Sequence, residues 1–403
     1  MTGTARKPGF LQGLTLVLPI TMAVVGVTIF TATATLMAAH FSSIPHGEYL
    51  SGFIQTMPGF WIVVFSPVSG WLADRFGRRS ILITAMFVYT VAGVLPFFLE
   101  NVYAILLTRC FVGMCEAIIM TVTTTMICDY FTGRSRDRWL AAQSGVSSLS
   151  ALLVIPIGGA LGGAFGWHGP FLAYLYSAIL AFAVIAFTWE PQSQASMAND
   201  PSEADEALYA TMPWGRIVTI LAVTIVASVC FYATLTKNSY ALNALGVSDP
   251  NRIGVLSGMA SLGVPIGTVI FWIISALPVG TLLTLDFLLI GVGFLLMANA
   301  TDPFHYALAA NVQQIGCGLI LPTLLVWMSR GLAFVIRGRA VGLWQGAFGI
   351  GLFISAAVLT LLSEKLHGIL PSFDLLGKIA LGAAVLALLS SLVPRVLRPA
   401  PSP

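Results

Sequence analysis

Two charged residues lie inside one apolar stretch, and their spacing suggests proton chemistry. Arg109 and Glu116 both fall within residues 102–130, with Gly113 between them. Seven residues turn an α-helix by about 700°, close to two full turns, so both side chains share one face. Burial disfavours the charged form of a carboxyl and a nearby cation favours it, so a buried Glu can bind and release a proton as its surroundings change. We predict that Glu116 carries a proton and that Arg109 is its neighbouring cation or binds an anionic group; the alternative is a structural Arg–Glu pair between helices.

Other apolar stretches contain further polar side chains. Lys237 stands toward the end of one, where it could attract an anionic compound or extend its amine to the nearest water, the more ordinary behaviour of lysine. Asp286 lies inside another, and the sequence assigns it no role. Amides in such helices usually face an interior or wet surface. We therefore expect a substrate cavity to be lined by Lys237 and by Gln55, Gln143, Asn311, Gln314, Trp344 and Gln345.

The sequence lacks the patterns that carry common enzymatic chemistry. It contains no H-E-x-x-H, no G-x-S-x-G and no G-x-x-x-x-G-K-[ST], which argues against a metalloprotease, a serine hydrolase and a nucleotide-driven pump. Five cysteines fall in apolar stretches, and we interpret them as buried thiols without a disulfide. We expect no enzyme activity, no cofactor and no metal site.

Composition identifies the surroundings of these residues. Of 403 residues, 57% are hydrophobic and only 9% are charged, against roughly 25% in a soluble domain. A soluble enzyme is therefore excluded, and a net charge of +3 is too small for a nucleic-acid binder. We predict an integral membrane protein whose surroundings are the lipid bilayer.

Apolar runs long enough to cross a bilayer, about 20 residues each, number twelve. The predicted class is an all-α membrane protein with two six-helix bundles, residues 1–189 and 214–403, joined by a polar linker at 190–213. The twelve predicted spans are 12–39, 49–73, 79–99, 102–130, 138–164, 169–189, 214–243, 252–276, 280–300, 304–330, 338–363 and 374–394.

The distribution of Lys and Arg predicts the orientation. With an even number of spans both tails share one side, and that side carries 14 of the 19 basic residues against 3 on the other. Positive charge concentrates in cytoplasmic loops, so the tails and the linker are expected in the cytoplasm. The apolar run after Arg6 and Lys7 is too long for a cleaved signal, and we interpret it as a retained span.

The chain also repeats itself. A shift of 203 residues aligns Gly113 with Gly316 and Arg134 with Arg337, and it matches three further pairs: Phe131 with Phe334, Arg136 with Arg339, and Leu140 with Leu343. Such repeats build many secondary transporters, which bind substrate near the membrane midplane between the halves.

Residues 70–79, GWLADRFGRR, stand between the second and third spans. This segment closely resembles the G-x-L-A-D-R-x-G-R-[RK] signature of the major facilitator superfamily. The resemblance implies two bundles that alternate in access, with a conformational latch at Gly70, Asp74, Arg75, Gly77, Arg78 and Arg79. In the outward-open state Asp74 would meet the start of the eleventh helix; the alternative is that the arginines only set topology.

Two further patterns concern coupling. Residues 109–117, RCFVGMCEA, resemble the R-x-x-x-G-x-x-x-A motif of proton-coupled members. The antiporter glycine motif in the fifth span is degenerate, because Pro156 and Gly159 stand in place but alanines and isoleucine replace other glycines. The pattern is closest to bacterial twelve-helix drug or metabolite:proton antiporters, which implies a monomer in the bacterial inner membrane.

The predicted function is therefore proton-coupled export of a small, partly apolar compound. Proton-coupled uptake of a metabolite is the alternative, and lipid translocation is a third function of the same fold. A membrane enzyme or a receptor would need residues that the sequence does not supply.

Overall fold

A computed structural model describes residues 8–191, 213–329 and 334–392, and within these ranges every regular element is a helix. The helices before the linker are α1 Phe10–Val17, α2 Ile20–Thr28, α3 Ala34–His40, α4 Gly47–Phe76, α5 Arg78–Val94, η1 Leu95–Phe98, α6 Val102–Tyr130, α7 Gly133–Phe165, η2 Gly166–Leu175 and α8 Tyr176–Phe187. Those after it are α10 Trp214–Ala244, α11 Pro250–Ser261, α12 Gly263–Ile274, α13 Val279–Ala298, α14 Pro303–Ser329, α15 Phe334–Lys365 and α16 Ile369–Leu392.

Eleven helical stretches in the described part of the chain are long and apolar enough to cross a membrane. One of them, Gly133–Phe187, has 55 residues, far more than the roughly 20 that one crossing needs. It turns back at Gly166, whose φ of +67° is a conformation that glycine adopts readily, so α7 makes one crossing and η2 with α8 makes the next. Counting that stretch twice gives twelve crossings, and the predicted helical membrane fold is confirmed.

Two predicted spans are not continuous helices. The first, expected over residues 12–39, is divided into α1, α2 and α3 by a break before Pro19 and by turns at residues 29–33. The eighth, expected over 252–276, is divided at Leu262 into α11 and α12. Proline has no N–H to donate to the carbonyl four residues earlier, so Pro19 and Pro265 each remove a hydrogen bond near a break.

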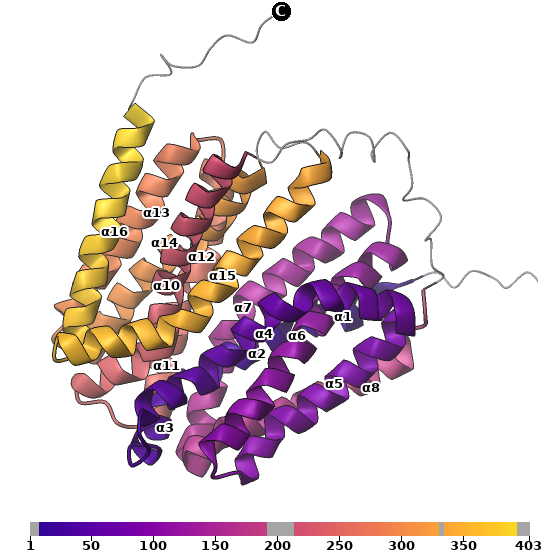
Figure 1. Cartoon of the computed structure of the whole chain (residues 1–403), viewed down its shortest axis with the longest axis horizontal. Coiled ribbons are helices and arrows are strands. Elements are labelled where there is room, and N and C mark those ends of the chain that lie inside the picture. The colour runs from indigo at the N-terminus through magenta and orange to yellow at the C-terminus, as the bar shows by residue number, and fades with distance from the viewer. Residues whose placement is uncertain (1–7, 192–212, 330–333, 393–403) are drawn as a thin grey trace, which may run out of the picture.

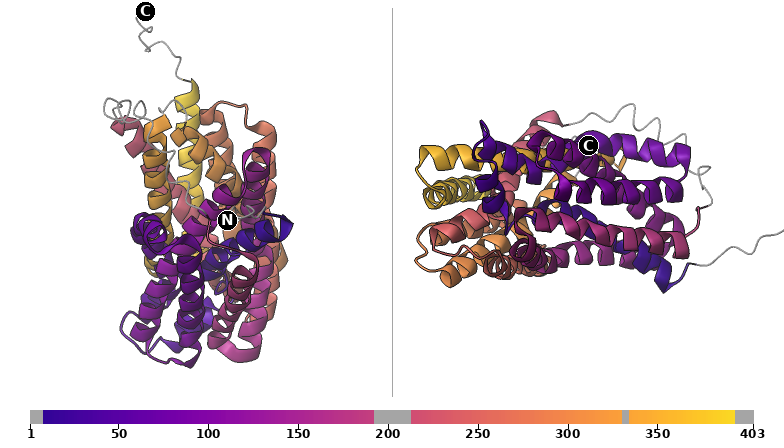
Figure 2. Two further views of the ribbon diagram at one scale, coloured as in Figure 1. Left: turned by 90° about the vertical axis from the view of Figure 1, so that its right-hand side faces the viewer. Right: turned by 90° about the horizontal axis from the view of Figure 1, so that it is seen from below.

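The helices form two groups, each with its own apolar core (Figures 1 and 2). One core is built from buried residues between Leu16 and Val184, and the other mainly from residues between Ala227 and Ala384, with Ala32 contributed by the first group. We call these groups the N-bundle (α1 to α8) and the C-bundle (α10 to α16). The side of the molecule where α8 ends and α10 begins is called the linker side.

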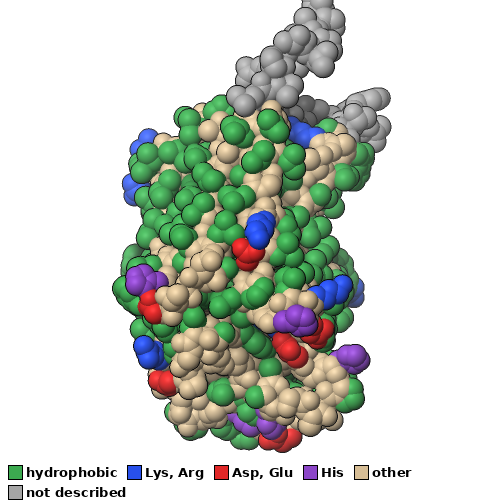
Figure 3. All heavy atoms as spheres, turned by 90° about the vertical axis from the view of Figure 1, so that its left-hand side faces the viewer, with side chains coloured by type: hydrophobic (Ala, Val, Ile, Leu, Met, Phe, Trp, Pro, Cys, Tyr) green, Lys and Arg blue, Asp and Glu red, His purple; other side chains and the backbone are tan. Residues whose placement is uncertain are grey.

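The outer surface is apolar, as a bilayer requires. Figure 3 shows hydrophobic side chains spread over much of one face, while acidic side chains and histidines lie mainly toward its lower end. Trp272 and Leu386, for example, are 80% and 69% exposed. In water such a surface would be an aggregation hazard, whereas lipid tails are as apolar as these side chains.

The bundles meet along two seams, α4 against α15 and α7 against α11. Glycine allows both contacts: a Cβ on Gly59 would overlap Leu352, and one on Gly159 would lie 2.9 Å from the Cα of Gly254. All these positions lie in the halves of α4 and α7 that are remote from the linker side. Toward the linker side the bundles diverge (Figure 1), and Pro67 and Trp71 of α4, which follow Val63 on its C-bundle face, are exposed.

Candidate functional site

Arg109 and Glu116 both lie in the interior of the N-bundle, on the α6 face that meets α2, and both side chains are fully buried. The guanidinium of Arg109 is held by neighbours other than Glu116. Its Nε donates to Ile54 O at 3.1 Å, and its Nη2 donates to the hydroxyl of Tyr174 at 2.5 Å and to Gly26 O at 3.4 Å. The rings of Phe30 and Tyr174 lie 5.3 and 5.0 Å from its Cζ, within the range of cation–π attraction.

Glu116 has no comparable set of partners. Neither carboxyl oxygen has a hydrogen-bond partner, and a Cβ placed on Gly26 would overlap Oε1, so the carboxyl rests against the bare backbone of α2. Arg109 and the hydroxyl of Tyr89 lie within electrostatic reach, but that hydroxyl donates to Met22 O at 2.7 Å. Tyr232 of α10, in the other bundle, is also within electrostatic reach.

The two charges therefore share one face of α6, as their spacing predicts, without forming an ion pair. The interpretation as a structural Arg–Glu pair is wrong for this conformation. Arg109 retains one unpartnered donor, Nη1, and Glu116 two unpartnered acceptors. A buried carboxylate ion that has no partner costs on the order of several kcal/mol. This geometry therefore favours the neutral carboxyl.

Two of the predicted cavity amides join helices. Gln55 is buried, and its Nε2 donates to Val27 O at 2.8 Å and to Leu235 O at 3.3 Å, which links α4 to α10 across the bundles. Asn311 donates to Met259 O at 3.0 Å and thereby ties α14 to α11. Both amides satisfy backbone carbonyls near helix breaks.

The other predicted cavity residues are dispersed. Gln143 is buried within the N-bundle and bonds to Thr124 and Thr123 of α6 at 3.1 and 3.3 Å. Gln314 is 1% exposed, and neither its oxygen nor its nitrogen has a partner. Trp344 is half-buried with an unpartnered Nε1, and Gln345 is exposed. The structure does not bring these residues together in one place.

Lys237 is buried, contrary to the interpretation that its amine extends to water. Its side chain is 3% exposed, and Nζ lies 2.9 Å from Oε1 of Glu48 at the start of α4. The ring of Tyr240 lies 4.1 Å from the amine. A cation from the C-bundle is thus paired with an anion from the N-bundle.

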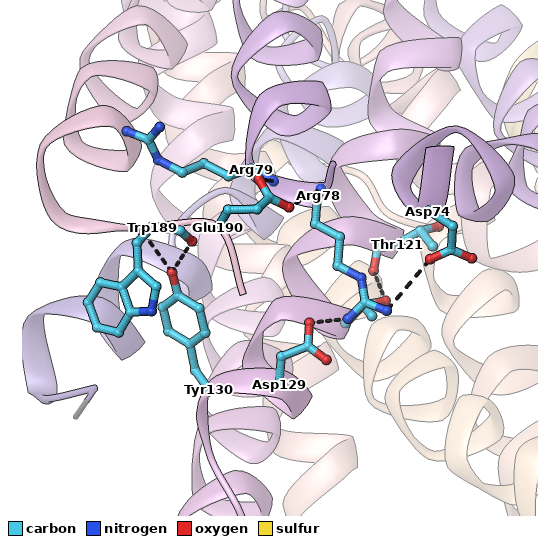
Figure 4. A network of polar contacts seen from close by, with 9 residues as sticks. Asp74, Arg78, Arg79, Thr121, Asp129, Tyr130, Trp189 and Glu190 are labelled. Atoms are coloured by element: carbon cyan, nitrogen blue, oxygen red, sulfur yellow. Dashed lines mark hydrogen bonds and ion pairs between the residues drawn. The ribbon is translucent and has the colours of Figure 1, made fainter. Parts of the chain in front are cut away.

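The basic motif at residues 70–79 lies on the linker side and is part of a polar network (Figure 4). Gly77 has φ +86° and separates α4 from α5. Arg78 pairs with Asp129 at the end of α6 and lies 3.6 Å from Asp74. The carboxylate of Glu190 accepts the backbone N–H groups of Arg78 at 2.6 Å and Arg79 at 3.0 Å, so it caps the N-terminus of α5.

Asp74 faces solvent, with 73% of its side chain exposed. The side chains at the start of α15, to which the latch prediction assigns its contact, lie outside the described residues.

The other residues of the motif have separate surroundings. Around Gly70 there is open space, and the guanidinium of Arg75 lies over Trp71 at 5.4 Å from the ring centre. Arg79 donates from Nη2 to Ile185 O at 2.8 Å.

Sequence reasoning missed several partners of these residues. Asp129, Glu190 and Glu48 each stand at the end of an apolar span, where a carboxylate opposite a known Arg or Lys is a usable signal. Tyr174 could not be found in this way, because its hydroxyl is neutral and carries no charge opposite to that of Arg109. The cysteines were also partly misassigned: Cys128 is exposed and Cys110 half-buried, whereas Cys115, Cys230 and Cys317 are buried.

Known proteins share parts of this sequence. The sphingosine-1-phosphate transporter SPNS2 of Danio rerio is 31% identical over 29% of this chain and 22% of its own length. The niacin transporter of Acinetobacter baylyi is 28% identical over 34% of this chain and 31% of its own, and the multidrug transporter MdtP of Bacillus subtilis is 26% identical over 39% and 28%. The matched stretch spans less than a third of each of these relatives.

Solved structures share the whole fold. A bacterial homologue of the human lysosomal transporter Spinster superposes with a TM-score of 0.77 at 16% identity over 97% of this chain and 98% of that one. A D-xylose–proton symporter superposes with a TM-score of 0.74 at 16% identity, over 94% and 97%. At these identities the likeness shows the fold alone.

The sequence profile of the Major Facilitator Superfamily matches residues 14–298, which is most of the chain. Together with the two bundles and the basic loop between α4 and α5, this match confirms the resemblance. The chain belongs to the Major Facilitator Superfamily and is a multi-pass membrane transporter rather than an enzyme.

Proposed function

We propose that this transporter couples proton movement to the export of a small, partly apolar compound, with Glu116 as the proton carrier. The observation that supports this most is the unpartnered carboxyl of Glu116, fully buried about two helical turns from Arg109, whose guanidinium donates its hydrogen bonds to other groups. Because α2 contributes the backbone on which both residues rest, a movement of α2 would change the surroundings of both charges together.

The coupling follows from the energies of the two states. In the described conformation the neutral carboxyl is favoured, because neither a hydrogen bond nor a direct ion pair compensates a charge on Glu116. When water reaches Glu116, or when the free Nη1 of Arg109 approaches it, the carboxylate becomes favourable and the proton leaves. Protonation then depends on conformation, and by reciprocity conformation depends on protonation.

Aromatic side chains between the bundles support a partly apolar compound. Phe353 of α15 lies 5.3 and 5.1 Å, between ring centres, from Phe53 and Phe60 of α4. Tyr232 of α10 lies 5.5 Å from Phe348 of α15. Such rings bind flat or apolar groups by burial and stacking, with little demand for a particular polar pattern. The match to a multidrug transporter agrees with this preference.

The positive charges of the sequence support an orientation with the linker side in the cytoplasm. The described conformation would then be closed toward the outside and open toward the cytoplasm. We propose that the carrier is a monomer in a bacterial inner membrane, that residues 1–189 and 214–403 rock against each other, and that Asp74 contacts α15 only after the cytoplasmic side closes.

Proton-coupled uptake is the second candidate function, and the match to a niacin transporter favours it. A pH-sensitive dye separates the two functions. The purified full chain is placed in liposomes that contain pyranine, and ethidium or nicotinate is added outside. A compound that enters while protons leave indicates exchange, and a compound that enters together with protons indicates symport. Transport of a probe that neither moves protons nor responds to a pH gradient would contradict proton coupling altogether.

A further inference from the structure

Polar contacts join the two bundles at the side remote from the linker. Lys237 of the C-bundle pairs with Glu48 of the N-bundle, with 2.9 Å between Nζ and Oε1. Beside this pair, the hydroxyl of Tyr49 on α4 donates to Oε2 of Glu364 on α15 at 2.8 Å. We call Glu48, Tyr49, Lys237 and Glu364 the seam cluster. In the described part of the chain, the Glu48–Lys237 contact is the one ion pair that connects the bundles.

The two members of this ion pair differ in burial. Lys237 is 3% exposed at its side chain, whereas Glu48 is 40% exposed. A buried ammonium without a partner is costly, while a half-exposed carboxylate can turn to water. The pair therefore stabilises Lys237 only while α4 and α10 remain in contact. If α4 withdraws, Lys237 loses its counter-ion and has to be hydrated.

The position of the seam cluster matches that of a closure. Glu48 lies in the first turn of α4 and Glu364 in the last turn of α15, at the same end of the molecule. One turn farther in along α4, Gly52 approaches Ala356, with 3.0 Å between a Cβ built on Gly52 and that of Ala356. The stacked rings of Phe53 and Phe353 lie at the same level. A polar layer thus covers an apolar layer where the bundles meet.

We propose that the seam cluster is the gate that closes this carrier on the side remote from the linker, and that the Glu48–Lys237 pair biases the carrier toward that closed state. This inference rests on the proposed alternating access. The seam cluster differs from the motif at residues 70–79, which lies on the linker side. That motif would act in the other half of the transport cycle, when the linker side is closed.

Thiol labelling tests the gate without a substrate. The five native cysteines are replaced, and Ala356→Cys, buried at 2% exposure behind the seam cluster, reports opening to a membrane-impermeant maleimide added on the side remote from the linker. In the variant with both Glu48→Gln and Lys237→Met, we expect labelling to be faster by about fivefold or more, the lower range of coupling between two conformations. Removing both charges avoids an unpaired buried ion, so this variant should fold.

Two further variants make the test specific. The exchanged pair, Glu48→Lys with Lys237→Glu, should return labelling toward the original rate. Lys378→Met removes an exposed pair within α16, between Nζ and Asp374 Oδ2 at 2.6 Å, and should leave labelling unchanged. Unchanged labelling in the double variant, or equally fast labelling in the exchanged pair, would overturn the gate.

A cross-link separates failure of the gate from failure of the proposed function. Gly52→Cys with Ala356→Cys places two Cβ atoms slightly closer than the roughly 3.8 Å of a disulfide, which a small shift accommodates. Oxidation should then stop ethidium transport, and reduction should restore it. If the cross-linked protein still transports, alternating access is wrong; if it does not, but the double variant labels at the original rate, only the gate is wrong.

Discussion

Replacing Glu116 with Gln tests the proposed coupling most directly. The substitution keeps the shape of the side chain and removes its proton. Because Glu116 is fully buried without a hydrogen-bond partner, the neutral carboxyl is the form that the described conformation favours, and an uncharged amide resembles it. We expect the free energy of unfolding to change by about 1 kcal/mol or less, since neither side chain gains or loses a bond here.

The expected effect on transport is much larger. A difference of one pH unit corresponds to about 1.4 kcal/mol per proton, so exchange of one proton can concentrate a compound about tenfold. In the Glu116→Gln variant the proton no longer moves, and the accumulation ratio should stay near one whatever the pH gradient. The compound should still cross down its own gradient, because the path between the bundles is unchanged.

The assay measures accumulation of ethidium or nicotinate in liposomes at equal pH and across one pH unit. Asp286→Asn is the matched control, because Asp286 is also fully buried with two unpartnered oxygens but lies in the C-bundle. The control should retain the tenfold ratio. A Glu116→Gln variant that still accumulates the compound tenfold would refute the assignment, and loss of accumulation only in Asp286→Asn would transfer the role to that residue.

Three further substitutions have defined expectations. Arg109→Lys removes the fork that binds three acceptors and should lower the unfolding free energy by about 1 to 3 kcal/mol in a detergent melt; an unchanged melt would mean that these contacts are unimportant. Gly26→Ala places a methyl group against Glu116 and should reduce transport strongly, whereas Gly145→Ala, with open space around it, should not; equal effects would contradict the packing argument. Asp74→Asn should slow turnover severalfold without changing which compounds are carried, as measured by initial rates for two probes, and altered preference would assign Asp74 to the substrate site.

Much of the fold could be predicted from the sequence, because a bilayer demands long apolar helices and positive loops mark their ends. The breaks were missed for a local reason. The runs around Pro19 and Leu262 are as hydrophobic as the helices beside them, so hydropathy alone does not interrupt them. Proline, as at Pro19 and Pro265, is tolerated in membrane helices, which makes it a weak signal of a break.

The candidate site was predictable only within one helix. The shared face of Arg109 and Glu116 follows from helix geometry, but their separate partners do not, because Tyr174 and Gly26 come from other helices. The place of Glu48 at the end of a span makes it a candidate counter-ion, but only the packing of α4 against α10 shows that it meets Lys237, 189 residues away. Pairings between bundles depend on the conformation of the carrier, and a sequence encodes more than one.

Glu190 has a practical consequence for engineering the protein. Its carboxylate holds the end of the N-bundle against the first turn of α5. Beside it, the hydroxyl of Tyr130 donates to the backbone O of Trp189 and accepts the backbone N–H of the same residue. The last residues before the linker are thus fastened to their own bundle by contacts that need nothing from the C-bundle. A protease site introduced between residues 191 and 213 should therefore cut the polypeptide in two while leaving these contacts at the end of the N-bundle in place, and co-expressed fragments become a means of labelling one bundle alone.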